Sequence, residues 1–314
     1  MTYRPASLDD AGLAADLMHP AFPADPVITR FRWVNLREGY EAGRFIAEDG
    51  GEPIAFLAWL HGPWAKLPDR HCEIEVWLDR RRTDTGLFVE LWSWIEREAV
   101  RQGSRMLLAY CGEDEPEQLD ALKALGYTQE RAEKVWVLDL KQHGARLVSE
   151  ATAAREKVKA AGVELLTVAD WNDADKYRKL YHLNEETIQD VPHTLPIVTE
   201  AFADFEKRVH APDRRDDRWW IACERDRVVA MSYLKYPPVR GTVWTGFTCV
   251  DSEHRGRGIA RAVKLQTLAQ AVELGVPEVH TDNDAENAPM LHINETLGYE
   301  RRPGWVEHHK RVDR

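Results

Sequence analysis

The chain has 314 residues, of which 44% are hydrophobic and 30% charged, and 53 acidic against 42 basic residues give a formal charge of −11. This composition predicts a globular protein of about two domains and excludes a disordered chain, a collagen and an integral membrane protein. An acidic chain lacks the basic face that nucleic acids need, and no apolar run reaches the ~18 residues of a membrane span, so we expect neither partner.

Each half of the chain shows the same predicted series of elements. A short strand (2–6; 164–168) precedes a helical segment, and a β-rich stretch broken by a polar turn follows (45–61; 219–236). Next come a strand (72–78; 242–250), an amphipathic helix (86–101; 258–274) and another strand (105–110; 278–281). A second helix ending at Leu-Gly-Tyr and a last strand (134–140; 305–312) close each half. Mixed β-α-β order predicts an α/β or α+β fold with helices on the faces of a sheet.

The repeated series reflects a duplication. An aspartate and three glycines recur at a constant spacing of 172 residues: Asp79/Asp251, Gly86/Gly258, Gly103/Gly275 and Gly126/Gly298. Upstream, residues 46–55 match 221–230 at a spacing of 175. Matches at one spacing, in one order of elements, indicate internal repeats. We predict domains at 1–140 and 163–314, joined by a helical linker at 141–162 that Gly162 ends.

The second half carries a candidate phosphate loop, in which the strand ending at Val250 leads through Arg-Gly-Arg-Gly into a helix near Gly258. Glycines let a ligand approach the backbone, and the first turn of a helix offers unpaired N–H groups and a positive dipole end. A dinucleotide fingerprint needs a third glycine where Arg261 stands, and the Walker Gly-Lys-Ser/Thr is absent. The loop therefore predicts a phosphate or pyrophosphate site of a different kind.

These residues resemble motif A of the GNAT superfamily of acyl-CoA-dependent N-acyltransferases, Arg/Gln-x-x-Gly-x-Gly/Ala, which Arg255, Gly258 and Ala260 match. The later family motif, Asn-x-x-Ala-x-x-Leu-Tyr-x-x-Leu-Gly-Phe, is similar to the stretch from Asn287 to Tyr299. The resemblance covers the second half well and the first half weakly. It implies two tandem GNAT-like domains, each a mixed, mostly antiparallel sheet flanked by helices.

The resemblance also implies acetyl-CoA as co-substrate and specific residues that bind it. Backbone of Thr248, Cys249 and Val250 would pair with pantetheine, and a backbone N–H near Cys249 or Val250 would polarise the thioester. Asn287 would hydrogen-bond the cofactor near the pantetheine, Asn294 could hydrogen-bond its sulfur, and Arg257, Arg261 or Lys264 could meet the 3′-phosphate. The pyrophosphate would be held by the amides of Arg255, Gly256, Arg257, Gly258, Ile259 and Ala260.

The first half lacks these features. At the spacing of 172, the positions of Arg255, Gly256, Arg257, Ala260 and Asn287 hold Thr83, Asp84, Thr85, Phe88 and Glu115. An aspartate repels a pyrophosphate, and a phenylalanine blocks close approach. We predict that this half binds no CoA and instead covers the sheet edge and shapes the acceptor pocket.

The catalytic residues depart from the family pattern. The usual acid, a tyrosine seven residues after the motif asparagine, is here Asn294, which can hydrogen-bond the sulfur but cannot act as an acid. The usual glutamate before motif A is also missing. The candidate replacements are Asp190 and His193, with Glu185 and Glu186 left open.

We therefore expect an N-acetyltransferase that moves an acetyl group from acetyl-CoA to a primary amine of a small molecule by direct attack in a ternary complex. The alternatives are another acyl-CoA donor or acceptor, or a non-catalytic acyl-CoA-binding protein. Scattered cysteines without a CxxC pair, the absence of clustered metal ligands and the lack of an apolar leader predict a cytoplasmic protein with reduced thiols and no metal. A monomer or a dimer fits the sequence.

Overall fold

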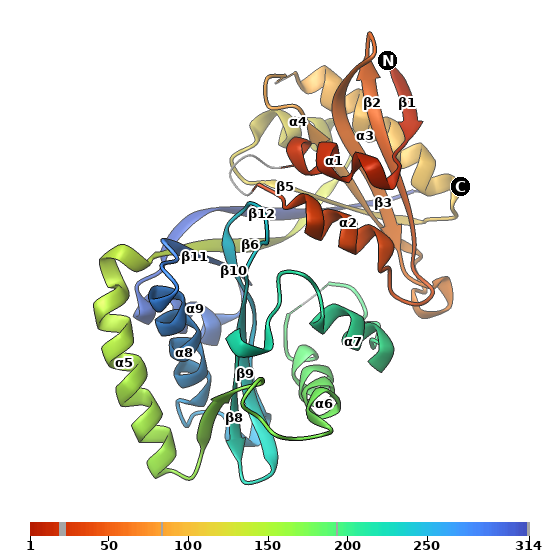
Figure 1. Ribbon diagram of the computed structural model, residues 1–314. Helices are drawn as coiled ribbons and strands as arrows, with labels where there is room; N and C mark the ends of the chain where they lie inside the picture. The colour runs from red at the N-terminus through yellow and green to blue at the C-terminus, as the bar shows by residue number, and fades with distance from the viewer. Residues whose placement is uncertain (19–22, 83, 193, 313–314) are drawn as a thin grey trace.

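The computed structural model describes residues 1–18, 23–82, 84–192 and 194–312 (Figure 1). Both halves contain the predicted series of elements. In chain order the elements are β1 (Thr2–Pro5), η1 (Leu8–Asp10), α1 (Ala11–Leu17), α2 (Pro26–Val34), β2 (Glu41–Asp49), β3 (Glu52–His61), η2 (Trp64–Lys66), β4 (His71–Leu78), α3 (Thr85–Arg101), β5 (Met106–Gly112), α4 (Pro116–Ala124), β6 (Thr128–Asp139), α5 (Leu140–Ala160), β7 (Glu164–Thr167), α6 (Lys176–Ile188), α7 (Phe202–Val209), η3 (Asp216–Arg218), β8 (Trp219–Glu224), β9 (Arg227–Lys235), β10 (Val243–Val250), η4 (Ser252–His254), α8 (Ile259–Glu273), β11 (Glu278–Asp284), α9 (Ala288–Leu297) and β12 (Glu300–Arg311).

A single sheet runs through the molecule. Within the described residues it has twelve strands in the order β1-β2-β3-β4-β5-β12-β6-β11-β10-β9-β8-β7. Read from one edge of the sheet, β1 to β5 of the first half lie in chain order. Read from the opposite edge, β7 to β11 of the second half lie in chain order as well. Neighbouring strands are antiparallel except β4/β5 and β10/β11, which are parallel. The predicted mixed, mostly antiparallel sheet flanked by helices is confirmed.

The two halves exchange their last strands. β12 pairs with β5 of the first half, where Val306 lies opposite Cys111, and β6 pairs with β11 of the second half, where Lys134 lies opposite Asn283. Val306 accordingly belongs to the core of the first half. The expectation that each last strand closes its own half is wrong, because the edges of β5 and β11 are equivalent and accept either strand.

Backbone hydrogen bonds repeat in both halves and confirm the duplication at the level of structure. The equivalent pairs are Asp79 N to Ile54 O at 2.8 Å and Asp251 N to Val229 O at 2.8 Å, and Tyr127 N to Leu122 O at 3.0 Å and Tyr299 N to Asn294 O at 3.1 Å. The second pair follows a glycine of positive φ in each half, +84° at Gly126 and +90° at Gly298. Both helices therefore end through the same left-handed turn.

Helix α8 lies in the interior of the second half, with α5 beside it (Figure 1). Apolar and buried side chains occupy every face of α8, as expected of a helix enclosed on all sides. The predicted linker helix is α5, and its Leu147 and Ala151 join the core that α8 forms with the sheet. On the opposite face of the sheet lie α6 and α7 (Figure 1). The phosphate-loop helix α8 is therefore packed between α5 and the sheet, while α6 and α7 cover the other face.

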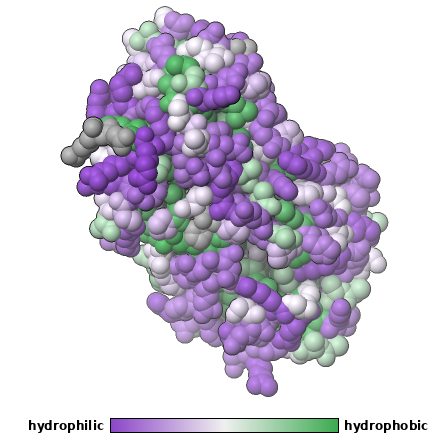
Figure 2. All heavy atoms as spheres, turned by 180° about the vertical axis from the view of Figure 1, so that it is seen from behind, coloured by the Kyte–Doolittle hydropathy of each residue, from purple (hydrophilic) through white to green (hydrophobic). Residues whose placement is uncertain are grey.

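The rear surface is largely hydrophilic, with hydrophobic groups showing only in patches between polar side chains (Figure 2). In the part of the chain that the structure describes, no helix combines the length and apolar character needed to cross a membrane.

Candidate functional site

The strands β10 and β11 separate at the centre of the second half. Among the described residues they pair only at Val243 and Trp244, whereas β10 stays paired with β9 through Val250. A bulge after Thr245 starts the separation, and only glycine fits at position 246, because a Cβ there would lie 1.9 Å from the Tyr233 ring. The result is a gap along one edge of β10.

The residues predicted to meet pantetheine lie on this edge. Thr248, Cys249 and Val250 follow the point of separation on β10. Cys249 is buried, and its burial raises the pKa of the thiol to about 12. Because the thiolate is the nucleophilic form of cysteine, this thiol is poorly suited to carry an acyl group.

The predicted phosphate loop opens α8. Gly256 and Gly258 have φ values of +72° and +77°, and the N-cap Gly258 provides no side chain to cap the helix. No atom lies within 4 Å of a Cβ placed at either glycine. The first N–H groups of α8 therefore face open space beneath the positive end of the helix dipole, which is the arrangement that binds anions.

Arginines surround this loop, each paired with a carboxylate. Arg257 contacts Glu224 at 2.8 Å, Arg261 contacts Glu150 at 2.6 Å, and Arg255 pairs with Asp190. The side chains of these pairs are 31–52% exposed, so a phosphate can displace the carboxylates at small cost. Ile259 is buried and offers only its backbone, and Ala260 is half-buried.

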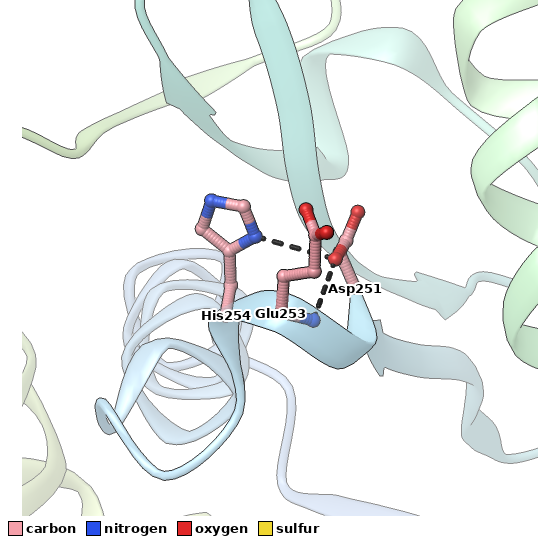
Figure 3. A group of neighbouring side chains, drawn as sticks. All are labelled: Asp251, Glu253 and His254. Atoms are coloured by element: carbon pink, nitrogen blue, oxygen red, sulfur yellow. Dashed lines mark hydrogen bonds and ion pairs between the residues drawn. The ribbon is translucent and has the colours of Figure 1, made fainter.

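The side chains of Asp251, Glu253 and His254 lie together at the start of the loop (Figure 3). The carboxylate of Asp251 accepts the N–H of Glu253 at 2.9 Å and contacts His254 Nδ1 at 3.3 Å. Arg227 forms ion pairs with both carboxylates of the cluster. These contacts connect the turn that leads into the phosphate loop to β9 through Arg227.

The equivalent helix of the first half is closed to anions. The carboxylate of Asp84 caps α3 by accepting the N–H of Leu87 at 2.7 Å, and Phe88 packs against the core. The donor that would face a phosphate is thereby occupied by a negative group. Thr83 lies outside the described residues. The prediction that this half binds no CoA remains a prediction, and this geometry supports it.

Known proteins resemble part of the second half in sequence and the whole chain in fold. Residues 177–299 match the Acetyltransferase (GNAT) family. This segment of the second half is a GNAT domain. No curated protein matches the chain.

Solved structures share the architecture of the whole chain. The "tandem GNAT protein from the clavulanic acid biosynthesis pathway" is 18% identical, covers 100% of this chain and 99% of its own, and has a TM-score of 0.77. A GCN5-related N-acetyltransferase from Sphaerobacter thermophilus is 21% identical with 100% and 96% coverage and a TM-score of 0.69. An acetyltransferase from Colwellia psychrerythraea is 11% identical with 98% and 99% coverage and a TM-score of 0.63. At these identities the likeness establishes the tandem GNAT fold.

In the GNAT domain, the side chains of three residues predicted to meet the cofactor are engaged within the protein. Asn287 caps α9, where its side chain accepts the N–H of Met290 at 3.4 Å. Asn294 and Lys264 are both 0% exposed, and Lys264 Nζ donates to Asn294 Oδ1 at 2.9 Å. The suggestion that Lys264 meets the 3′-phosphate is therefore wrong, because its ammonium points into the interior.

The predicted bases are not brought to one place. Asp190 is exposed at the end of α6 and pairs with Arg255 beside the phosphate loop. His193 lies outside the described residues. Glu185 lies on α6, where burial raises the pKa of its carboxyl. Neither Asp190 nor Glu185 lines the pocket that the described residues form beside β10 and β11.

That pocket lies between the two halves and has a volume of about 510 Å³. It reaches β10 at Trp244 and Thr245 and β11 at Asp282, the region where these strands separate. Five tryptophans line it, from both halves of the chain: Trp33, Trp59, Trp77, Trp244 and Trp305. The sequence did not predict that these tryptophans meet in one pocket, because they are far apart in the chain. The only signal was the high number of tryptophans.

Charged groups of both signs line the pocket. Burial raises the pKa values of the Asp282 and Glu75 carboxyls and lowers the pKa of Lys235 to about 8. Arg32 and Arg44 lie on the same wall and their charges oppose the rise for Glu75, as the charge of Lys235 does for Asp282. The pocket thus offers carboxylates and an aromatic surface to an amine that arrives at the gap between β10 and β11.

Proposed function

We propose that the GNAT domain transfers an acetyl group from acetyl-CoA to a primary amine of a small molecule, by direct attack in a ternary complex. The observation that carries this proposal is the glycine-initiated, uncapped start of α8 next to the gap between β10 and β11. Its support is the family match of residues 177–299 together with this geometry.

The chain's own residues would hold the cofactor in an extended path. Amides of Arg255 to Ala260 would bind the pyrophosphate, and the edge of β10 at Thr248–Val250 would pair with pantetheine. A backbone N–H at Cys249 or Val250 would then polarise the thioester carbonyl, as an oxyanion site requires. The raised pKa of Cys249 favours direct attack over an acyl-enzyme on this thiol.

The pocket between the halves would hold the acceptor. An alkylammonium with a pKa near 10.4 must lose a proton before it attacks, which costs about 5 kcal/mol at pH 7. Asp282 lies on the pocket wall beside the separation of the strands, and burial raises its pKa toward the range where a carboxylate accepts protons. We assign it as the base, in place of Asp190 and His193.

Calorimetric titration of acetyl-CoA tests the cofactor site. The variant is Gly258→Glu, which places a carboxylate at the start of α8. The matched control is Gly86→Glu, at the equivalent position of the first half. We expect one site per chain in the wild type and in Gly86→Glu, and loss of binding in Gly258→Glu.

Two results would contradict the proposal. No binding to the wild type would remove the acetyltransferase assignment, and loss in Gly86→Glu alone would move the site to the first half. Once binding is established, an amine screen with acetyl, propionyl and longer acyl donors tests the donor and the reaction.

A further inference from the structure

A buried chain of three polar side chains crosses the core of the GNAT domain. Lys264 on α8 donates to Asn294 Oδ1 on α9 at 2.9 Å, and Asn294 Nδ2 donates to Asn283 Oδ1 on β11 at 2.6 Å. Lys264 and Asn294 are 0% exposed, whereas Asn283 is half-buried. The ammonium also lies 5.0 Å from the centre of the Tyr299 ring.

The burial of Lys264 is unfavourable for the free energy of folding. Burial in apolar surroundings disfavours the charged form of lysine and lowers the pKa of Lys264 to about 7. Removing an ionisable group from water is expensive, and apolar residues of similar volume often stabilise such a site. A position that only supports the fold would therefore favour a hydrophobic side chain.

The first half of the same chain provides that comparison. At the spacing of 172, Lys264, Asn294 and Asn283 correspond to Trp92, Leu122 and Cys111. Cys111 faces Val306 just as Asn283 faces Lys134, so the strand positions are structurally equivalent. The three first-half residues are apolar, with exposures of 0%, 0% and 1%. The fold is thus satisfied by an apolar trio, and the polar trio occurs in the half with the open phosphate loop.

The direction of the chain is fixed by its first member. In its charged form Lys264 only donates hydrogen bonds, so it meets the oxygen of Asn294, whose amide N–H then meets the oxygen of Asn283. Each bond polarises the next, which strengthens the last donor. That donor is Asn283 Nδ2, for which the described residues supply no acceptor in hydrogen-bond distance.

The terminal amide lies where the strands have separated. β11 leaves β10 after His280, and Asn283 follows three residues later. Asp282 faces the pocket between the halves, and successive side chains of a strand point to opposite faces. Asn283 accordingly faces α8 and α9, the helices that flank the proposed path of the cofactor.

We propose that Asn283 donates a hydrogen bond to the sulfur of CoA as the C–S bond breaks, and that Lys264, acting through Asn294, supplies the positive charge behind it. In this step the carbon–sulfur electron pair passes to the sulfur, which leaves as a thiolate, and water protonates it afterwards. Asn283 is the catalytic residue, and Lys264 and Asn294 are positioning residues. The inference rests on the proposed function, because it needs CoA in the gap.

The test is the pKa of the CoA thiol in its complex with the protein, followed by thiolate absorbance during a pH titration. A free thiol ionises near 8.5. We expect the wild type to lower the pKa of the bound thiol by about one unit or more. The four cysteines of the chain do not interfere below pH 10, since burial raises each of their pKa values to about 12.

Three variants separate charge from structure. Lys264→Met removes the charge and the donor, Lys264→Gln keeps a donor without a charge, and Lys159→Met removes an exposed lysine of α5 as the control. We expect the thiol pKa to return toward 8.5 in both Lys264 variants and to stay low in the control. If Lys264→Met fails to fold, the pKa of the bound thiol is measured instead in Asn283→Leu, which changes the half-buried end of the hydrogen-bonded series.

Kinetics give the second readout. With a competent amine, kcat of Lys264→Met should fall roughly tenfold to hundredfold while KM for acetyl-CoA stays within a factor of about three. An unshifted thiol pKa in the wild-type complex, or full kcat in Lys264→Met, would overturn the inference and leave the proposed function intact. Failure of CoA to bind the wild type would instead overturn the proposed function, and this inference with it.

Discussion

The two halves share a backbone and differ at a few decisive residues. Gly256 in the phosphate loop replaces the helix cap Asp84, and Lys264 replaces the buried Trp92. Each change alters charge or hydrogen bonding. The sequence predicted the first difference because the loop is local, but not the second, because a buried lysine is recognised only once its neighbours in space are known.

Asp282 provides the first prediction at this scale. A base works only when deprotonated, and burial raises the pKa of this carboxyl. The rate of wild-type turnover should therefore rise with pH through that raised pKa and fall at lower pH. Asp282→Asn should lower kcat about 10²-fold and remove this limb of the pH profile. A variant that keeps both the rate and the limb would show that another group accepts the proton.

At the scale of elements, the equivalent helices α3 and α8 differ in how their first turns are satisfied. The side chain of Asp84 satisfies the first turn of α3, while the first turn of α8 is left to a ligand. Local signals of this kind can be read from a sequence, since a capping aspartate and a glycine pair have distinct patterns. The open gap beside α8 depends on the bulge at Gly246 and its contact with Tyr233, which no local pattern announces.

Removing the cap tests this division of roles. Asp84→Ala should destabilise the protein by about 1 kcal/mol, because a first-turn N–H of α3 loses its partner. It should not create a second CoA site, since Phe88 still packs where a phosphate would approach. Urea unfolding measures the first effect and calorimetry with acetyl-CoA the second. Two equivalents of bound acetyl-CoA would show that Asp84 alone closes the first half.

At the scale of the whole molecule, the exchange of β6 and β12 joins the halves into one sheet. The sequence predicted both strands and the duplication, but not which half each strand would complete. Both arrangements place the same apolar residues against equivalent edges, so hydrophobic pattern cannot distinguish them.

Truncation makes the exchange measurable. Deleting residues 300–314 removes β12 and should expose β5, so that amides of Leu107–Cys111 in the first half lose hydrogen-exchange protection. A deletion of residues 1–5 is the control, because β1 is an edge strand that covers only β2. Retained protection of β5 after the C-terminal deletion would mean that β6 takes the place of β12 and that the exchange is dispensable.

The exchange of strands also affects when the first half can complete its fold during translation. The edge of β5 is complete at residue 112, but its partner in the finished sheet begins at residue 300. At about 5–20 residues per second, the ribosome needs roughly 10–40 s to translate the intervening chain. During that time the nascent first half either presents an open strand edge or borrows β6, which it must later release. The translation of β12 therefore decides when the first half reaches its final form.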